Sequence, residues 1–155
     1  MRWATGPPEV EVDEPDTVTG SVIGAALEVH RHLGPGLLEG VYEACLAQEL
    51  DLRGIPYRRQ LDVPVVYKGI RVDAGCRLDL LVAERVIVEL KAVRSLENVH
   101  TAQVLSQLRI TGYRTALLIN FNVPMLRSGL RRLSLTDEGL EVDSTGILDR
   151  VRHHS

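Results

Sequence analysis

The sequence predicts one α/β domain in which helices flank a central mixed β-sheet. Apolar residues first recur at helical spacing, and after residue 56 the pattern changes to short β-rich runs separated by turns. A helical segment then divides two apolar strands, an order that predicts a right-handed crossover between parallel strands. With 155 residues, 45% of them hydrophobic, the chain can bury a core without disulfides or a structural metal.

Two helices open the predicted domain. Thr17 or Thr19 can cap the first helix, and Gly34-Pro35 stops it. The second helix is expected to start near Gly36 and to end at about Arg53. Residues 1–16 are acidic and contain prolines, and they lack the apolar side chains that would offset the entropy lost on ordering, so we expect a disordered leader.

Three strands follow these helices. Lys68-Gly69 forms a turn between a β-rich run at 61–67 and a longer run at 70–82. A second turn at 83–85 leads into an apolar strand that starts at Val86. The two turns predict consecutive hairpins.

The remaining elements complete an α-α-β-β-β-α-β-β order. Ser95 is a candidate cap for a third helix that continues to Ile110. A buried strand at 116–119 and an edge strand at 129–135 follow. The predicted domain therefore covers residues 17–135, and residues 136–155 are expected to form a C-terminal tail.

Composition excludes several classes of protein. The chain has 18 Lys and Arg against 21 Asp and Glu, a net charge of −3, so it lacks the basic field of a histone-like or polybasic membrane-binding protein. Aromatic residues make up 4%, too few for a platform that stacks single-stranded bases. No apolar run approaches a membrane span, and Cys45 and Cys76 offer no disulfide framework. We therefore expect a cytoplasmic protein without a membrane partner.

Three charged residues interrupt strands that are otherwise apolar. Asp79 lies in the run 78–82, and Glu89 and Lys91 lie in the run 86–91. The turn at 83–85 places Asp79 directly opposite Glu89, with Lys91 on the same face. Two carboxylates at that spacing repel unless they are neutralised, and Mg²⁺ held by carboxylates, water and phosphate oxygens would neutralise them. The structural alternative is an edge-strand Asp beside a solvated Glu-x-Lys pair.

A further carboxylate occupies a helical face that should be buried. Glu39 shares a stripe with Tyr42, Leu46 and Leu50, so it needs a partner. It could approach the sheet end that holds the two strand carboxylates. Alternatively, it only stabilises the positive end of the helix dipole.

Other polar side chains flank the proposed site. On the third helix, Gln103 and Gln107 share a face, where an amide can orient a water or a carboxylate. Arg77, Arg94 and Arg109 are the candidate phosphate contacts, because a guanidinium binds phosphate in a bidentate manner. Ordinary surface amides and solubilising charges are the alternatives.

Two of these motifs resemble one family. Asp79, followed after a hairpin by Glu89-Leu90-Lys91, resembles the Asp…Glu-x-Lys signature of the PD-(D/E)XK nuclease superfamily. Residues 36–42, read as Gly-Leu-Leu-Glu-Gly-Val-Tyr, match the pattern that names its GxxExxY branch. The resemblance covers roughly residues 20–133.

This resemblance implies a restriction-endonuclease-like core and a metal-dependent nuclease. The implied catalytic residues are Glu39, Asp79, Glu89, Lys91 and Gln103. Glu39, Asp79 and Glu89 would hold Mg²⁺ or Mn²⁺. Gln107 stands where many relatives carry a Tyr, so the sequence departs from the family pattern at that position.

Two functions stay open at this point. The first is a Mg²⁺-dependent nuclease that hydrolyses phosphodiester bonds of DNA, with RNA as an alternative substrate. The second is a catalytically inactive module that keeps the nuclease fold and binds nucleic acid or protein. The net charge of −3 points slightly toward the second, since nonspecific DNA affinity comes from phosphate neutralisation. The oligomeric state is open, a homodimer included.

Overall fold

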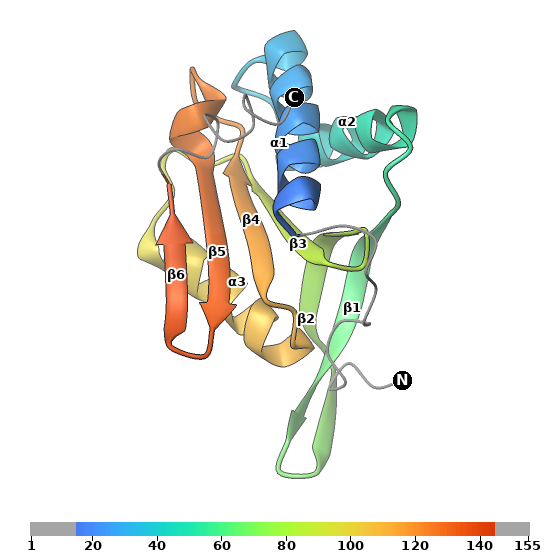
Figure 1. Cartoon of the computed structure of the whole chain (residues 1–155), viewed down its shortest axis with the longest axis vertical. Helices are drawn as coiled ribbons and strands as arrows, with labels where there is room; N and C mark the ends of the chain where they lie inside the picture. Colours follow the sequence, from blue (N-terminus) through green and yellow to red (C-terminus); the bar gives the residue numbers. More distant parts are fainter. Residues whose placement is uncertain (1–14, 145–155) are drawn as a thin grey trace.

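The computed structural model describes residues 15–144, which fold into a mixed sheet with helices on both faces (Figure 1). Within these residues the sheet has six strands in the order β1-β2-β3-β4-β5-β6. The helical elements are α1 (Pro15–Leu33), α2 (Glu39–Leu52), α3 (Asn98–Thr111) and the 3-10 turn η2 (Leu126–Gly129). The strands are β1 (Tyr57–Tyr67), β2 (Ile70–Val82), β3 (Val86–Lys91), β4 (Thr115–Asn120), β5 (Leu130–Thr136) and β6 (Gly139–Asp143). This is the α/β architecture that the sequence predicted.

The crossover through α3 sets the centre of the sheet. β3 and β4 pair in parallel, from Val86 beside Thr115 to Lys91 beside Asn120, as expected for strands joined by a helix. All other neighbouring strands run antiparallel. Both central strands are buried almost throughout, which explains their unbroken apolar sequences.

Two apolar cores lie on opposite faces of the sheet. One joins α1 and α2 to the sheet, and the other packs α3 against it. Alternation along the strands divides their side chains between the two, so that Val88 faces α1 and α2 whereas Ile87 faces α3. The α1-α2 core is the larger and contains the stacked rings of Tyr42 and Phe121.

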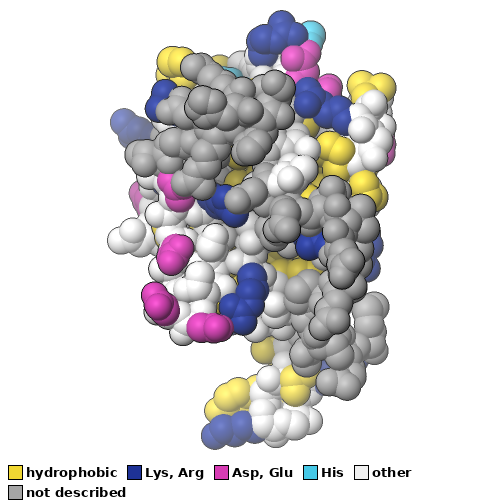
Figure 2. Space-filling model, viewed as in Figure 1, with side chains coloured by type: hydrophobic (Ala, Val, Ile, Leu, Met, Phe, Trp, Pro, Cys, Tyr) yellow, Lys and Arg dark blue, Asp and Glu magenta, His cyan; other side chains and the backbone are white. Residues whose placement is uncertain are grey.

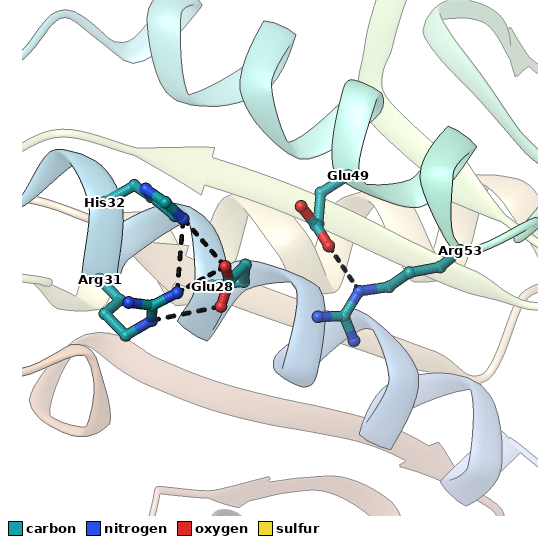
Figure 3. A network of polar contacts seen from close by, with 5 residues as sticks. All are labelled: Glu28, Arg31, His32, Glu49 and Arg53. Atoms are coloured by element: carbon teal, nitrogen blue, oxygen red, sulfur yellow. Dashed lines mark hydrogen bonds and ion pairs between the residues drawn. The ribbon is translucent and has the colours of Figure 1, made fainter.

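Ion pairs line the outer surface of α1 and α2 (Figure 3). Glu28 of α1 accepts hydrogen bonds from Arg31 and His32. Arg53, at the end of α2, donates to Glu49 at 2.8 Å and lies against Gly24 of α1, where an added Cβ would come within 3.1 Å of its guanidinium. The Arg53 guanidinium therefore occupies the space that a side chain at position 24 would take.

Helix boundaries differ from the sequence prediction at three points. The first helix begins at Pro15, so Thr17 and Thr19 lie inside it and neither caps it, and the last two residues of the expected leader are helical. The second helix begins at Glu39 rather than near Gly36. Glu97, not Ser95, caps α3, because its amide donates to Nδ1 of His100 at 2.9 Å. Residues 92–97 form a loop, and the helix therefore starts two residues later than expected.

The predicted tail contains a strand. Residues 139–143 form β6, which pairs with β5, so β5 is not the edge strand that the sequence suggested. The turn between them is held by Thr136, whose hydroxyl donates to the carbonyl of Gly139 and accepts from the amide of Glu138. Residues 1–14 of the expected leader and 145–155 of the expected tail lie outside the described residues.

Candidate active site

Asp79 and Glu89 come together where β2 and β3 separate. Leu80 lies opposite Val88, and continuing this register by one residue sets Asp79 beside Glu89, as the three-residue turn predicted. The ladder stops at that point. Oδ2 of Asp79 instead accepts a hydrogen bond from the backbone amide of Leu90 at 2.9 Å. The carboxylate of Asp79 thus bonds to β3 in place of a backbone partner.

β2 is also irregular around Asp79 on the side that pairs with β1. Leu78 packs with the α3 core and Leu80 with the α1-α2 core, although residues two apart in a regular strand share a face. On β1, Gln60 stands opposite Asp79 but is absent from the ladder, and its φ is 49°. Left-handed backbone at a non-glycine residue is uncommon, and such strain often lies at functional sites.

Glu89 is a buried carboxylate with neighbours of both signs. It is 3% exposed, its Oε2 lies 3.3 Å from Nζ of Lys91, and its Oε1 accepts from Nε2 of Gln107 at 3.3 Å. Burial, and then the nearby charge of Asp79, raise the pKa of Glu89 to about 7, although Lys91 and Gln107 act in the opposite direction. The Asp79-Glu89 pair therefore resists double ionisation in the absence of a cation.

Two glutamines of α3 complete this arrangement. Oε1 of Gln103 accepts a hydrogen bond from Nζ of Lys91 at 2.8 Å. Gln107, 2% exposed, donates to Glu89 and, at 3.4 Å, to the carbonyl of Arg77, while its own Oε1 is buried without a partner among the described residues. One face of α3 thus supplies a hydrogen-bond acceptor for the ammonium group of Lys91 and a hydrogen-bond donor for the carboxylate of Glu89.

Glu39 approaches from the opposite face of the sheet. Glu39 itself is exposed, so the expectation of a buried helix face was wrong at this position. Partial burial raises its pKa first, followed by the charge of Asp79, while Lys91 lowers it. The charge of Asp79 therefore acts on both Glu39, at the start of α2, and Glu89, which faces α3. Within residues 15–144, no three His, Cys, Asp or Glu side chains converge tightly enough to hold a metal ion. Asp79 and Glu89 form the close pair, and Glu39 is linked to it only through the charge of Asp79.

Tyr42 fixes the segment that carries Glu39. Its hydroxyl donates to the carbonyl of Gly34 at 2.6 Å and accepts from the amide of Leu37 at 3.1 Å. Its ring stacks on Phe121 with centroids 4.6 Å apart and planes 6° from parallel. The loop before α2 is therefore tied to the residues that follow β4.

The end of β4 and the residues after it contact α1, the loop before α2 and the loop after β3. Oδ1 of Asn122 accepts from the amide of Gly36, and Nε2 of His30 lies 2.8 Å from the carbonyl of Val123. Asn120, 1% exposed, both donates to and accepts from the backbone of Val93. Residues 120–123 thus connect the loop before Glu39 to the loop after Lys91.

A family model of the PD-(D/E)XK nuclease superfamily matches residues 16–133, most of the chain. The chain belongs to this superfamily. Its nucleases generally use divalent metal ions and act on nucleic acid, which agrees with a nuclease-type function and with the restriction-endonuclease-like fold of this PD-(D/E)XK domain. No curated protein and no solved structure matched the sequence.

The PD-(D/E)XK domain contains one buried carboxylate that sequence reasoning missed. Glu43, 7% exposed, accepts from Nη2 of Arg59 at 3.0 Å and from Nε2 of Gln60 at 2.5 Å. It lies one helical turn from Glu39, so the two share a helix face. That spacing was its only signal in the sequence, since its partners come from β1.

The three candidate phosphate contacts of the PD-(D/E)XK domain are all exposed. Arg77 lies two residues before Asp79 and donates to Asp62 at 2.9 Å. Arg94 follows Lys91 by three residues, in the loop after β3. Arg109 lies on α3 about 120° around the helix from Gln103 and so points away from the face that contacts Lys91.

Among residues 15–144, no helix is long and apolar enough to span a membrane.

Proposed function

We propose that this chain is a nuclease that hydrolyses phosphodiester bonds of DNA with the aid of Mg²⁺ or Mn²⁺. The observation that carries the proposal is the pair of Asp79 and Glu89 at a break in the sheet, with the ammonium group of Lys91 3.3 Å from Glu89. A structural ion pair requires one carboxylate for one cation. This site holds a second carboxylate, and a third nearby in Glu39.

The donor set suits a hard divalent cation. Mg²⁺ is usually held by one or two carboxylates, with water and substrate phosphate oxygens at its other positions. Asp79 and Glu89 would be the direct ligands, and Glu39 would reach the ion directly or through a water. When bound, the ion would polarise the scissile phosphate and lower the pKa of the attacking water.

The remaining residues act on charge and position. Lys91 would stabilise the negative charge that develops on the phosphate, and Gln103 would hold its ammonium group in place through the 2.8 Å hydrogen bond. Arg77 and Arg94 would contact phosphates along the substrate, whereas Arg109 faces away from the site. Glu39 and Tyr42 belong to the GxxExxY pattern, and we infer that Tyr42 serves this site by fixing the start of α2.

A cleavage assay tests the proposal. The purified chain is incubated with duplex DNA, single-stranded DNA and RNA in Mg²⁺, Mn²⁺ or EDTA. We expect metal-dependent cleavage of DNA that Asp79→Ala abolishes. Asp137→Ala is the matched control, because Asp137 is an exposed carboxylate at the β5-β6 turn. Cleavage that continues in EDTA or in Asp79→Ala would refute the site.

The inactive module is the second outcome of this assay. The net charge of −3 favours it, because the protein's overall field repels a polyanion. Binding of nucleic acid without cleavage in either metal, equal in wild type and Asp79→Ala, would support that function.

A further inference from the structure

The β1-β2 hairpin extends well beyond the sheet (Figure 1). β2 pairs with β3 only over residues 80–82, whereas it pairs with β1 along nearly its whole length. The base of the hairpin is buried against α3 through Val63 and Leu78. Every residue from Val66 to Gly75 is exposed. The outer part of the hairpin is therefore a two-stranded ribbon without a packing partner in the described chain.

The register gives this ribbon an apolar face. Tyr67 lies opposite Ile70, and Val65 lies opposite Val72, so these four side chains share one side of the ribbon. Three of them are strongly exposed: Tyr67 is 62%, Ile70 65% and Val72 48% exposed. A water-exposed apolar face at the end of a ribbon adds nothing to the core of the fold, and it indicates a binding surface.

The same tip is positively charged. The exposed residues 66–75 carry Lys68 and Arg71 against a single acid, Asp73, whereas the chain as a whole carries −3. Nζ of Lys68 lies 5.4 Å from the centre of the Tyr67 ring, and Arg71 pairs with Asp73 in a bridge whose partners are 56% and 77% exposed. Such an exposed pair is worth little and can exchange for a phosphate. Figure 2 shows Lys or Arg beside hydrophobic side chains at this end of the molecule.

We propose that the ribbon tip, residues 65–72, binds B-form duplex DNA away from the catalytic site. Two-stranded ribbons fit the major groove, which is about 12 Å wide, and cationic tips bind the flanking phosphates. A second copy of the chain is a poorer occupant. The few exposed apolar side chains of the tip are too small a surface to supply the roughly 800 Å² per partner that stable interfaces bury. The proposal rests on the proposed nuclease function. It adds that the protein binds a long duplex more tightly than a short one.

The length of the ribbon sets the duplex that it can reach. Asp79 lies nine positions after Ile70 on β2, which corresponds to roughly 30 Å at the rise of an extended strand. At about 3.4 Å per base pair, a 12-bp duplex centred on the catalytic site ends short of the tip, whereas a 30-bp duplex extends past it.

Binding of 12-bp and 30-bp DNA by the full-length chain in EDTA tests the tip. We expect the double variant K68S/R71S to bind the 30-bp duplex roughly tenfold more weakly and to reduce its salt slope by about 2. A second double variant, Y67S/I70S, removes the apolar contacts and is also expected to lose affinity for this duplex. Binding of the 12-bp duplex should not change. A 30-bp RNA duplex should gain nothing from the tip, because its major groove is too narrow for a ribbon.

The double variant R31S/R114S is the matched control, since it removes two exposed charges from other parts of the molecule. Equal losses on both DNA lengths, or tip variants that bind like wild type, would overturn the proposal. A dimer in sedimentation that the tip variants abolish would assign the surface to a second copy instead. Cleavage of the 12-bp duplex in Mg²⁺ reports separately on the nuclease function, so either proposal can fail alone.

Discussion

The amide nitrogen of Gln107 donates a hydrogen bond to Oε1 of Glu89 at 3.3 Å, one helical turn beyond the glutamine that accepts from Lys91. Because one oxygen of Glu89 faces Gln107, the other is left beside the ammonium group of Lys91. Gln107 thereby orients the carboxylate that would bind the metal. It does so at a position where the family resemblance led us to expect a tyrosine.

Gln107→Met should weaken metal binding more than it weakens the fold. Methionine fills a similar volume but cannot donate to Glu89, and loss of such an outer partner typically lowers metal affinity 10- to 100-fold. Calorimetric titration with Mn²⁺ measures this effect without any substrate. Val104→Ala is the control, because Val104 is buried on the same helix in the α3 core. That variant should lower the melting temperature and leave Mn²⁺ affinity unchanged. Unaltered Mn²⁺ affinity in Gln107→Met would show that Gln107 only fills space.

The register of the candidate site could be predicted because strand alternation has a period of two. A three-residue turn and two interrupted apolar runs were enough to set Asp79 beside Glu89. The break around Asp79 could not be predicted, since nothing in its composition marks Gln60 as a residue with left-handed backbone. The Glu43 contacts were missed because they join a helix to a strand 16 and 17 residues away.

Tyr42→Phe should loosen the loop before α2 while leaving the aromatic stack in place. The variant removes the hydroxyl that bonds to the backbone of Gly34 and Leu37. Each lost hydrogen bond is worth about 1 kcal/mol, so we expect a loss of roughly 1–2 kcal/mol in the free energy of unfolding. Hydrogen exchange should become faster at the Leu37 amide. Slow exchange there would contradict a role for the hydroxyl in holding this loop.

Gly129→Ala and Gly40→Ala form a matched pair with opposite expected effects. A Cβ on Gly129 would overlap the carbonyl of Asn120, which lies in β4 and cannot move away easily. We expect a clear loss of stability, of about 1–3 kcal/mol. Gly40 lies in α2 with open space around it, so alanine should stabilise the helix by up to about 1 kcal/mol. Denaturant unfolding of both variants measures the contrast. A stable Gly129→Ala protein would mean that η2 can shift relative to β4.

Glu89→Gln should change how stability depends on pH in metal-free buffer. The pKa of Glu89 is about 7 in the folded protein, against 4.5 for an ordinary glutamate. Between these values the unfolded chain has lost a proton that the folded protein retains, so this group destabilises the fold as pH rises from about 4.5 through about 7. Glutamine cannot titrate. The variant's stability should therefore match wild type near pH 4 and exceed it increasingly up to neutral pH, with a constant difference above. Chemical denaturation at several pH values in EDTA gives this difference directly.

Adding Mn²⁺ at pH 8 should then stabilise wild type and not the variant, because only the intact carboxylate pair binds the ion to the folded state. A difference that stays flat across this pH range would show that Glu89 is ionised throughout and that its burial is compensated by Lys91 alone.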